Sequence, residues 1–495
     1  MNPRPTEPHP RRWAALAVLS ASLLLVAMDM TILNVALPEI SADLRPDAVQ
    51  LLWIVDVYSL VVAGLLVTAG ALGDRWGRKR MLLAGFAVFG LASVAVLWAD
   101  GPAEVIAVRA LLGIGGAMIM PSTLSMIRSM FTDPGERATA LGIWATMASA
   151  GAALGPIAGG LLLENFSWHA AFLVNVPVMV VAIAAGLILL PESRNPEPGR
   201  WDAWGTALSI AGMVALVYAI KHLASDGWTA AGVAAALLAA AALTWFVRRC
   251  LTRPDPLLEI RLFGNGAFTS GTLTALTSSI GLAGVLLILV QWMQLVHDYS
   301  PLQTGLALLP MALAAGVVSP LAPAIAARIG ARTVLAGGLA VSGLGFLALW
   351  TVPLTYPWVA FALLLIGAGL GSLAVASAVI MSGTPVEKAG SAAAIEETSY
   401  ELGATLGVAV LGSLASAFYR SHLPEDAAAP VRESLGGALA VAHETGSPAL
   451  AAQAEAAFTG SLQLTSLYGG IIILAAAAAI WRLTPARLDL ASAQH

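Results

Sequence analysis

Long apolar runs recur along this chain from end to end, and they limit its fold more than any other feature. A helix that crosses the ~30 Å hydrocarbon core of a bilayer needs ~20 predominantly apolar residues. Fourteen runs meet this need, at residues 13–37, 51–72, 81–99, 104–127, 137–163, 168–190, 204–223, 228–247, 267–295, 301–327, 333–352, 358–381, 392–418 and 461–483. The sequence therefore predicts an all-α polytopic membrane protein with fourteen spans.

The composition agrees with this reading and excludes several classes of protein. Of the 495 residues, 58% are hydrophobic and 11% charged, against about 45–50% and about 25% in soluble proteins. A formal net charge of −4 gives no basic surface for nucleic acid. The seven histidines lack metal-ligand spacing, and the single cysteine, Cys250, cannot form an intramolecular disulfide. We expect a multi-pass protein of the cell membrane with no metal site and no nucleic-acid partner.

The distribution of lysine and arginine predicts the orientation. An even number of spans places both termini on one side of the membrane. With the N-terminus inside, 20 of the 25 basic residues fall in cytoplasmic segments, as the positive-inside rule requires. Residues 1–12 and 486–495 are therefore predicted to be cytoplasmic tails.

A short internal repeat indicates how the spans are organised. A shift of 253 residues superposes LGDRWGRKRML (72–82) on IAARIGARTVL (325–335), and it aligns Gly77 with Gly330. The repeat predicts two six-helix halves, residues 13–200 and 251–485, with an additional pair of transmembrane helices at 201–250. Two repeated halves around a central cavity are typical of secondary transporters. Residues 419–460 are too polar to span and are predicted to be extracellular, either as an ordered loop or, as a resemblance described below implies, as a hairpin near the cavity mouth.

Ionisable residues inside the spans are the candidates for function, because each costs at least ~2.5–3.5 kcal/mol to insert. They are Asp29, Asp56, Arg109, Glu396, Glu397 and Glu401. Asp29 and Asn34 lie roughly on one helix face, in a helix expected to end at Pro38. A structural, hydrogen-bonded role is the alternative for Asp29, and an interfacial position is the alternative for Asp56.

The acidic cluster of the thirteenth span has the spacing that a proton carrier needs. Glu397 and Glu401 are four residues apart and share a face, while Glu396 points about 100° away. Two carboxylates so placed resist simultaneous ionisation. The alternative is that Glu396 and Glu397 stay hydrated near the cytoplasmic mouth. Arg109 is a permanent cation that must find a carboxylate or backbone carbonyls, in a structural or a functional role.

Small residues along the fifth span give a second signal. Gly151, Gly155 and Gly159 recur every four residues, so a neighbouring helix can approach closely. Pro156 removes one helix hydrogen bond beside them, and Gly160 follows directly. Close packing alone is an alternative to a mechanistic role. The chain has no phosphate-binding loop, so we expect an ion gradient to supply the energy, with no cofactor.

Six segments together resemble the motif set of the major facilitator superfamily, in its fourteen-span drug:proton antiporter branch of quaternary-ammonium and multidrug efflux pumps. They are DMTILNVALP (29–38), LGDRWGRKRML (72–82), residues 109–116, residues 151–160, WHAAFLVNVP (168–177) and residues 396–401. Their order and spacing fit the whole chain.

The resemblance implies a role for each motif in a monomeric exporter that works by alternating access and is not an enzyme. The loop 73–80 gates the cytoplasmic face, through Gly73, Asp74, Arg75, Gly77 and Arg78. Arg109 belongs to a proton relay, and Gly155 with Pro156 shapes the cavity and limits leak. Asp29, Asp56, Glu397 and Glu401 line a cavity where substrate cations and protons compete.

The function we predict is proton-coupled antiport that exports lipophilic cationic drugs, dyes or antibiotics. The partners are then the small-molecule substrate, protons and the lipid bilayer. The alternative is a dedicated exporter of a single endogenous natural product or metabolite. A receptor or scaffold that transports nothing is a third interpretation, but such a protein has no need of buried carboxylates.

Overall fold

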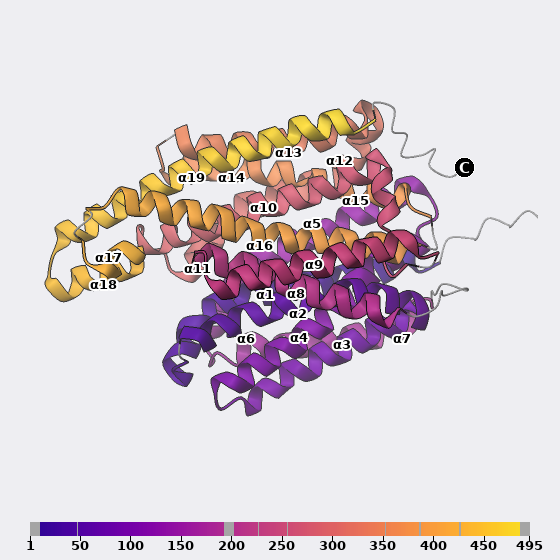
Figure 1. Ribbon diagram of the computed structural model, residues 1–495, viewed down its shortest axis with the longest axis horizontal. Coiled ribbons are helices and arrows are strands. Elements are labelled where there is room, and N and C mark those ends of the chain that lie inside the picture. Colours follow the sequence, from indigo (N-terminus) through magenta and orange to yellow (C-terminus); the bar gives the residue numbers. More distant parts are fainter. Residues whose placement is uncertain are drawn as a thin grey trace, which may run out of the picture.

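In the computed structural model, long helices lie side by side along the longest axis of the molecule (Figure 1). The structure describes residues 10–46, 48–192, 202–225, 227–254, 256–351, 353–385, 388–424 and 427–485. Within these ranges there is no β-strand, and thirteen segments are long and apolar enough to cross a membrane. The predicted all-helical membrane fold is confirmed.

The predicted span without a counterpart among these thirteen segments is the fifth, at 137–163, which corresponds to helix α5 (Pro134–Leu163). This helix is continuous over 30 residues, but its apolar part, Leu154–Leu163, is by itself too short to cross a membrane. The span count of fourteen and the cytoplasmic position of both termini therefore stay predictions. Residues 1–9 and 486–495 of the predicted tails lie outside the described residues.

The first half of the chain forms a helical bundle. Its helices are α1 (Arg12–Leu44), α2 (Ala48–Trp76), α3 (Arg78–Ala95), the short η1 (Val96–Trp98), α4 (Pro102–Met130), α5, α6 (Ala170–Leu173) and α7 (Asn175–Leu189). The closest helix pairs are α1 with α5, α2 with α4 and α3 with α4. Buried side chains of these helices, such as Phe86, Phe89 and Phe172, form one large apolar cluster.

The second half forms a separate cluster built in the same way, around side chains such as Phe346 and Trp292. Its elements are η2 (Ile260–Gly264), α10 (Gly266–Leu295), α11 (Pro301–Ala307), α12 (Leu309–Ile329), α13 (Ala331–Thr351), α14 (Tyr356–Leu370), α15 (Ser372–Ser382), α16 (Ala389–Ser421), α17 (Ala429–Glu433), α18 (Leu435–Thr445) and α19 (Pro448–Leu483). The halves meet where α5 packs on α11, α12 and α15, and where α16 packs on α2 and α4.

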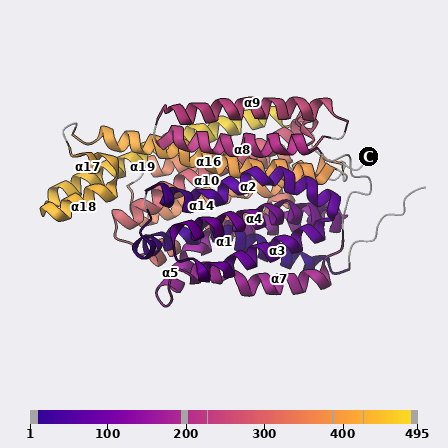
Figure 2. The same ribbon diagram turned by 60° about the horizontal axis from the view of Figure 1, so that its bottom comes forward.

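The predicted additional pair consists of α8 (Ala203–Ser225) and α9 (Ala230–Thr252). Figure 2 shows α9 at the outside of the bundle with α8 beneath it. Helix α8 contacts both α2 and α16, so it bridges the two halves. Helix α9 is the least buried of the membrane-spanning candidates in the described chain, and its exposed side is largely apolar, as lipid contact requires.

The backbone supports the internal repeat. Gly77 joins α2 to α3 with φ 106° and ψ 130°, and Gly330 joins α12 to α13 with φ 91° and ψ 143°. A positive φ of this kind favours glycine, because a Cβ atom would be strained there. Two glycines 253 residues apart thus make the same turn between corresponding helices.

One local prediction is wrong. Helix α1 does not end at Pro38 but continues to Leu44, where Asp43 Oδ2 accepts a hydrogen bond of 2.8 Å from Trp168 Nε1. This tertiary contact supports the helix beyond the proline, which removes only one backbone bond. The segment 419–460, predicted as an extracellular loop or hairpin, contains α17, α18 and the first turns of α19, which project from one end of the bundle (Figure 1).

Candidate functional site

A buried ion pair joins α1 to α4. Asp29 and Arg109 are 1% and 2% exposed, and Arg109 Nη1 lies 3.1 Å from Asp29 Oδ2. Arg109 Nε also donates to the backbone carbonyl of Ile54 on α2, at 3.3 Å. Arg109 was predicted to need a carboxylate or backbone carbonyls, and the structure gives it one of each. A charge at this depth is tolerated because its partner and its remaining hydrogen bonds are supplied by the neighbouring helices.

The sequence analysis did not single out the second partner of Asp29. Asn175, at the start of α7, donates from Nδ2 to Asp29 Oδ1 at 2.8 Å and to Ser93 Oγ on α3 at 3.3 Å. Asn175 is fully buried. The signal was present in the sequence, because this asparagine is a polar residue inside the apolar segment WHAAFLVNVP. Each carboxylate oxygen of Asp29 therefore has a donor, one charged and one neutral.

Three glutamates of α16 are buried in the second half. The exposed fractions of Glu396, Glu397 and Glu401 are 0%, 3% and 7%. Glu396 accepts hydrogen bonds from Ser377 Oγ on α15 and from Tyr400 Oη, the latter at 3.1 Å. Burial removes the alternative of hydrated glutamates at a mouth. Two oxygens of the cluster, Glu396 Oε2 and Glu397 Oε1, have no hydrogen-bond partner in the described structure.

Tyr58 on α2 lies between the two acidic clusters. Its ring lies under the guanidinium of Arg109, with Cζ 4.6 Å from the ring centroid, a cation–π geometry. The residue is fully buried, and it interacts electrostatically with both Asp29 and Glu401. Its hydroxyl has no hydrogen-bond partner among the described residues. The sequence alone does not single out Tyr58, yet this residue connects the charged groups of the two halves.

The glycines of α5 form the contact with α1 that their spacing predicted. A Cβ atom at Gly155 would lie 2.9 Å from the carbonyl oxygen of Met28 and would collide with Thr31 Oγ1. One at Gly159 would lie 3.0 Å from Ile32 Cγ1, and one at Gly151 would collide with Leu24. The contact includes Met28, the residue next to Asp29, so α5 fixes the backbone that presents this carboxylate. Gly160 faces α11 instead, and Pro156 lies inside the continuous helix.

The predicted gating loop contains an ion pair and a close contact with α7. Asp74 Oδ1 accepts from Arg78 Nη2 at 2.8 Å and from Nε at 3.0 Å, and Arg78 is 4% exposed. Glu192, just after α7, contacts Arg80 at 3.6 Å and lies against Gly77. Glu192 is a partner that the sequence analysis missed, because it lies more than 100 residues away.

The remaining predicted residues take less defined positions. The side chains of Asp56 and Asn34 lie outside the described part of the chain. Gly73 meets only ordinary contacts, so the packing does not demand a glycine there. Arg75 is half-buried next to Asp74. The structure thus brings together Asp29 with Arg109, and Glu396 with its two neighbours on α16, as two separate clusters.

No group of histidine, cysteine and acidic residues in the described chain is arranged to hold a metal ion. What the arrangement offers is buried carboxylates where two helical halves meet, which is a means of binding cations and protons. Two helical halves with charges buried between membrane-spanning helices define a membrane transporter. The chain belongs to the Major Facilitator Superfamily, whose family model matches residues 19–408.

Curated relatives and solved structures agree with this assignment. The chain is 43% identical to the multidrug efflux pump LfrA of Mycolicibacterium smegmatis, over 97% of each chain. It is 37% identical to the methyl viologen resistance protein SmvA of Salmonella typhimurium, over 95% of this chain and 98% of the relative. The human organic anion transporter MFSD10 shares the fold, with a TM-score of 0.61 and 15% identity over 94% of this chain and 100% of that chain. Drug efflux in the cell membrane is the activity of this family group.

Proposed function

We propose that the protein is a proton-coupled antiporter that exports lipophilic cations. The observation that carries the proposal is the set of buried carboxylates on two halves of one bundle, Asp29 in the first and Glu396, Glu397 and Glu401 in the second. Within the described chain, Glu396 and Glu397 form no ion pair. A carboxylate without a cationic partner takes up a proton or a substrate cation instead.

Competition for these carboxylates couples the two fluxes. A proton neutralises a glutamate and releases a bound cation, and a cation that binds favours the loss of a proton. Export against a gradient then needs only that the two conformations of the bundle differ in affinity for each ligand. No covalent step is required.

Asp29 and Glu397 have different parts in this proposal. Asp29 is held by Arg109 and Asn175, so its position and charge are fixed until Arg109 moves with α4. Glu397 has an oxygen without a partner, so it exchanges ligands without breaking an ion pair. We therefore assign substrate and proton exchange to Glu397 with Glu401, and coupling between the halves to Asp29, Arg109 and Tyr58.

A cationic substrate is supported by the relatives and by the charges of the site. One relative is named for resistance to methyl viologen, an organic dication, and another is named a multidrug efflux pump. The apolar surroundings of the glutamates suit a substrate that combines a positive charge with apolar surface, since desolvation strengthens the attraction.

The test uses purified protein in liposomes with a preset pH gradient. Addition of ethidium or a quaternary ammonium compound is expected to collapse the gradient with wild type. Glu397→Gln and Asp29→Asn are expected to abolish the collapse. Glu104→Gln, a change of an exposed acid in the first turn of α4, is the matched control and is expected to behave as wild type.

Two outcomes contradict the proposal. If folded wild-type protein fails to collapse the gradient with every cation tested, the dedicated natural-product exporter becomes the better interpretation. If Glu397→Gln and Asp29→Asn both collapse the gradient at the wild-type rate, the buried carboxylates do not couple proton flux. Size-exclusion profiles of each variant establish that the protein is folded in either case.

A further inference from the structure

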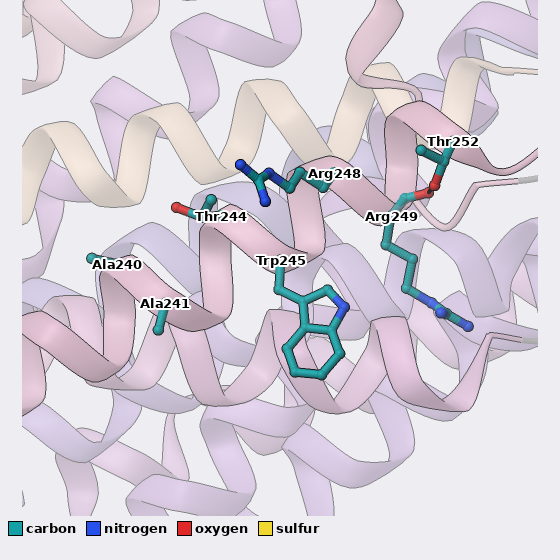
Figure 3. A pocket seen from close by; sticks show the side chains of 7 residues that line it. All are labelled: Ala240, Ala241, Thr244, Trp245, Arg248, Arg249 and Thr252. Atoms are coloured by element: carbon teal, nitrogen blue, oxygen red, sulfur yellow. Dashed lines mark hydrogen bonds between the residues drawn. The ribbon is translucent and has the colours of Figure 1, made fainter.

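A groove on the outer face of α9 has features that the transport function does not use. Its volume is about 690 Å³, and its lining consists of Ala240, Ala241, Thr244, Trp245, Arg248, Arg249 and Thr252 (Figure 3). Positions four residues apart form two neighbouring rows along the helix, one with Ala240, Thr244 and Arg248 and the other with Ala241, Trp245 and Arg249. The small alanines lie at one end of these rows and the two arginines at the other.

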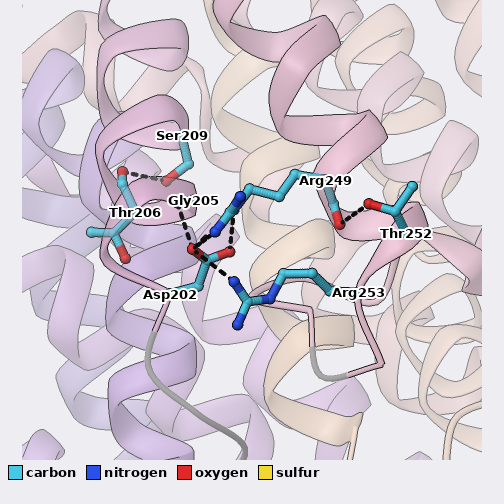
Figure 4. A network of polar contacts seen from close by, with 7 residues as sticks. All are labelled: Asp202, Gly205, Thr206, Ser209, Arg249, Thr252 and Arg253. Atoms are coloured by element: carbon cyan, nitrogen blue, oxygen red, sulfur yellow. Dashed lines mark hydrogen bonds and ion pairs between the residues drawn. The ribbon is translucent and has the colours of Figure 1, made fainter.

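The two arginines of the groove differ in their partners. Arg249 turns to Asp202 before α8, with Nε 2.8 Å from Oδ2 and Nη2 2.9 Å from Oδ1 (Figure 4). Arg253 reaches the same carboxylate at 3.5 Å. Arg248 is exposed and makes no hydrogen bond or ion pair with the described residues. The groove therefore presents one cation that the protein does not neutralise.

The Asp202 network keeps this arrangement rigid. Burial by itself would raise the pKa of the Asp202 carboxyl, but hydrogen bonds from Arg249 and from the backbone N–H of Gly205, with the charges of Arg249 and Arg253, lower it below its usual value. The carboxylate is thus ionised at neutral pH, and it ties the start of α8 to the end of α9. With Arg249 held on one side of the helix, Arg248 is directed to the other (Figure 3).

Aromatic residues mark this level as a membrane interface. Trp245 lies in the groove and packs edge to face on Trp204, with ring centroids 5.9 Å apart. Both indoles are more than half exposed. Exposed tryptophans on membrane helices concentrate where hydrocarbon meets the headgroups. A positive charge at this level, beside an apolar channel floored by alanine, matches the shape and charge of an anionic phospholipid.

We propose that the α9 groove binds an anionic phospholipid, with its phosphate on Arg248 and an acyl chain along Ala240 and Ala241. Charge complementarity selects this occupant, because the groove carries no acid among its lining residues and a cationic substrate is repelled by Arg248. Helix α8 contacts α2 and α16 and so bridges the two halves, and it also packs on α9. A lipid held on α9 therefore lies next to the helix that joins the halves.

The test measures lipid retention by native mass spectrometry of the full-length protein in a neutral detergent. Phosphatidylglycerol is expected to bind wild type at least about tenfold more tightly than phosphatidylcholine. Arg248→Ala is expected to lose this preference, and Arg248→Lys to keep it. Arg328→Ala is the matched control, because Arg328, like Arg248, is an exposed arginine near the end of a spanning helix.

A second variant separates the groove from the charge. Ala241→Trp fills the groove and leaves Arg248 in place, so it is expected to weaken phosphatidylglycerol binding as well. The proposal is overturned if Ala241→Trp binds like wild type, if Arg328→Ala loses the preference as Arg248→Ala does, or if millimolar inorganic phosphate displaces the lipid. A protein dimer that excludes the lipid from wild type, seen as twice the mass, also overturns it.

Discussion

Removal of one partner of the buried Asp29–Arg109 pair should destabilise the protein far more than removal of both. Asp29→Asn leaves the guanidinium of Arg109 buried at 2% exposure with no counter-charge. Such a change costs about 3–5 kcal/mol. Arg109→Gln leaves the Asp29 carboxylate with Asn175 as its remaining donor, so we expect a similar loss. The double variant buries two neutral amides in place of two charges, and we expect it to be more stable than either single variant.

The single cysteine provides the assay. Cys250 is 2% exposed on α9, so a thiol-reactive fluorophore labels it only after unfolding. Denaturant titrations of wild type, both single variants and the double variant then give a complete thermodynamic cycle. Transport in liposomes is measured in parallel. We expect the double variant to recover stability but not proton-coupled export, which separates the structural role of the pair from its role in coupling.

One result would refute this reasoning. If the losses of the two single variants simply add in the double variant, the groups do not interact, and the pair is not the unit that the geometry indicates. The control cycle uses Arg12 and Glu136, which pair at 2.8 Å but are partly exposed. Solvent screens that pair, so its coupling should be much smaller.

Three further predictions follow from single contacts. Gly155→Ala forces a Cβ against the backbone of α1 and should lower the unfolding free energy by about 1–3 kcal/mol. Gly337→Ala is the control and should cost nothing measurable, because nothing lies within 4 Å of a Cβ at that position. Equal losses in the two variants would contradict the packing argument. Tyr58→Phe removes a buried hydroxyl without a described partner, so the unfolding free energy from denaturant titration should stay unchanged or rise by about 1–3 kcal/mol. A fall in unfolding free energy of that size would reveal a hydrogen bond made by the Tyr58 hydroxyl. The pKa of Asp202 is lowered in the folded protein, so its contribution to stability is complete above the unfolded pKa of about 3.9 and is lost as the pH falls below that value. We therefore expect dithiodipyridine to label Cys250 of the Asp202→Asn variant at neutral pH as fast as it labels wild type in acid. If the variant is labelled at the rate of wild type at neutral pH, the network does not hold α9.

Periodic and local features of this protein were predictable from its sequence. The apolar runs predicted the spans, because only a helix satisfies its own backbone within a bilayer. The four-residue spacing of Gly151, Gly155 and Gly159 predicted a close helix contact, and the spacing of Glu397 and Glu401 predicted a shared face. The repeated turn at Gly77 and Gly330 was also visible as a repeated sequence. Each of these features, including each of the two glycine turns, is set by residues within a few helical turns of one another.

Partners and packing directions were decided by the tertiary structure. The sequence indicated that Arg109 needed a carboxylate, but only the arrangement of α1, α4 and α7 selected Asp29 and brought Asn175 to its other oxygen. Tyr58 became a link between the halves because α2 packs on both α4 and α16. The polar segment 419–460 became helical because its short helices pack on one another and on the extended start of α19. Such contacts join residues tens to hundreds of positions apart, and local sequence does not encode which distant surfaces will meet.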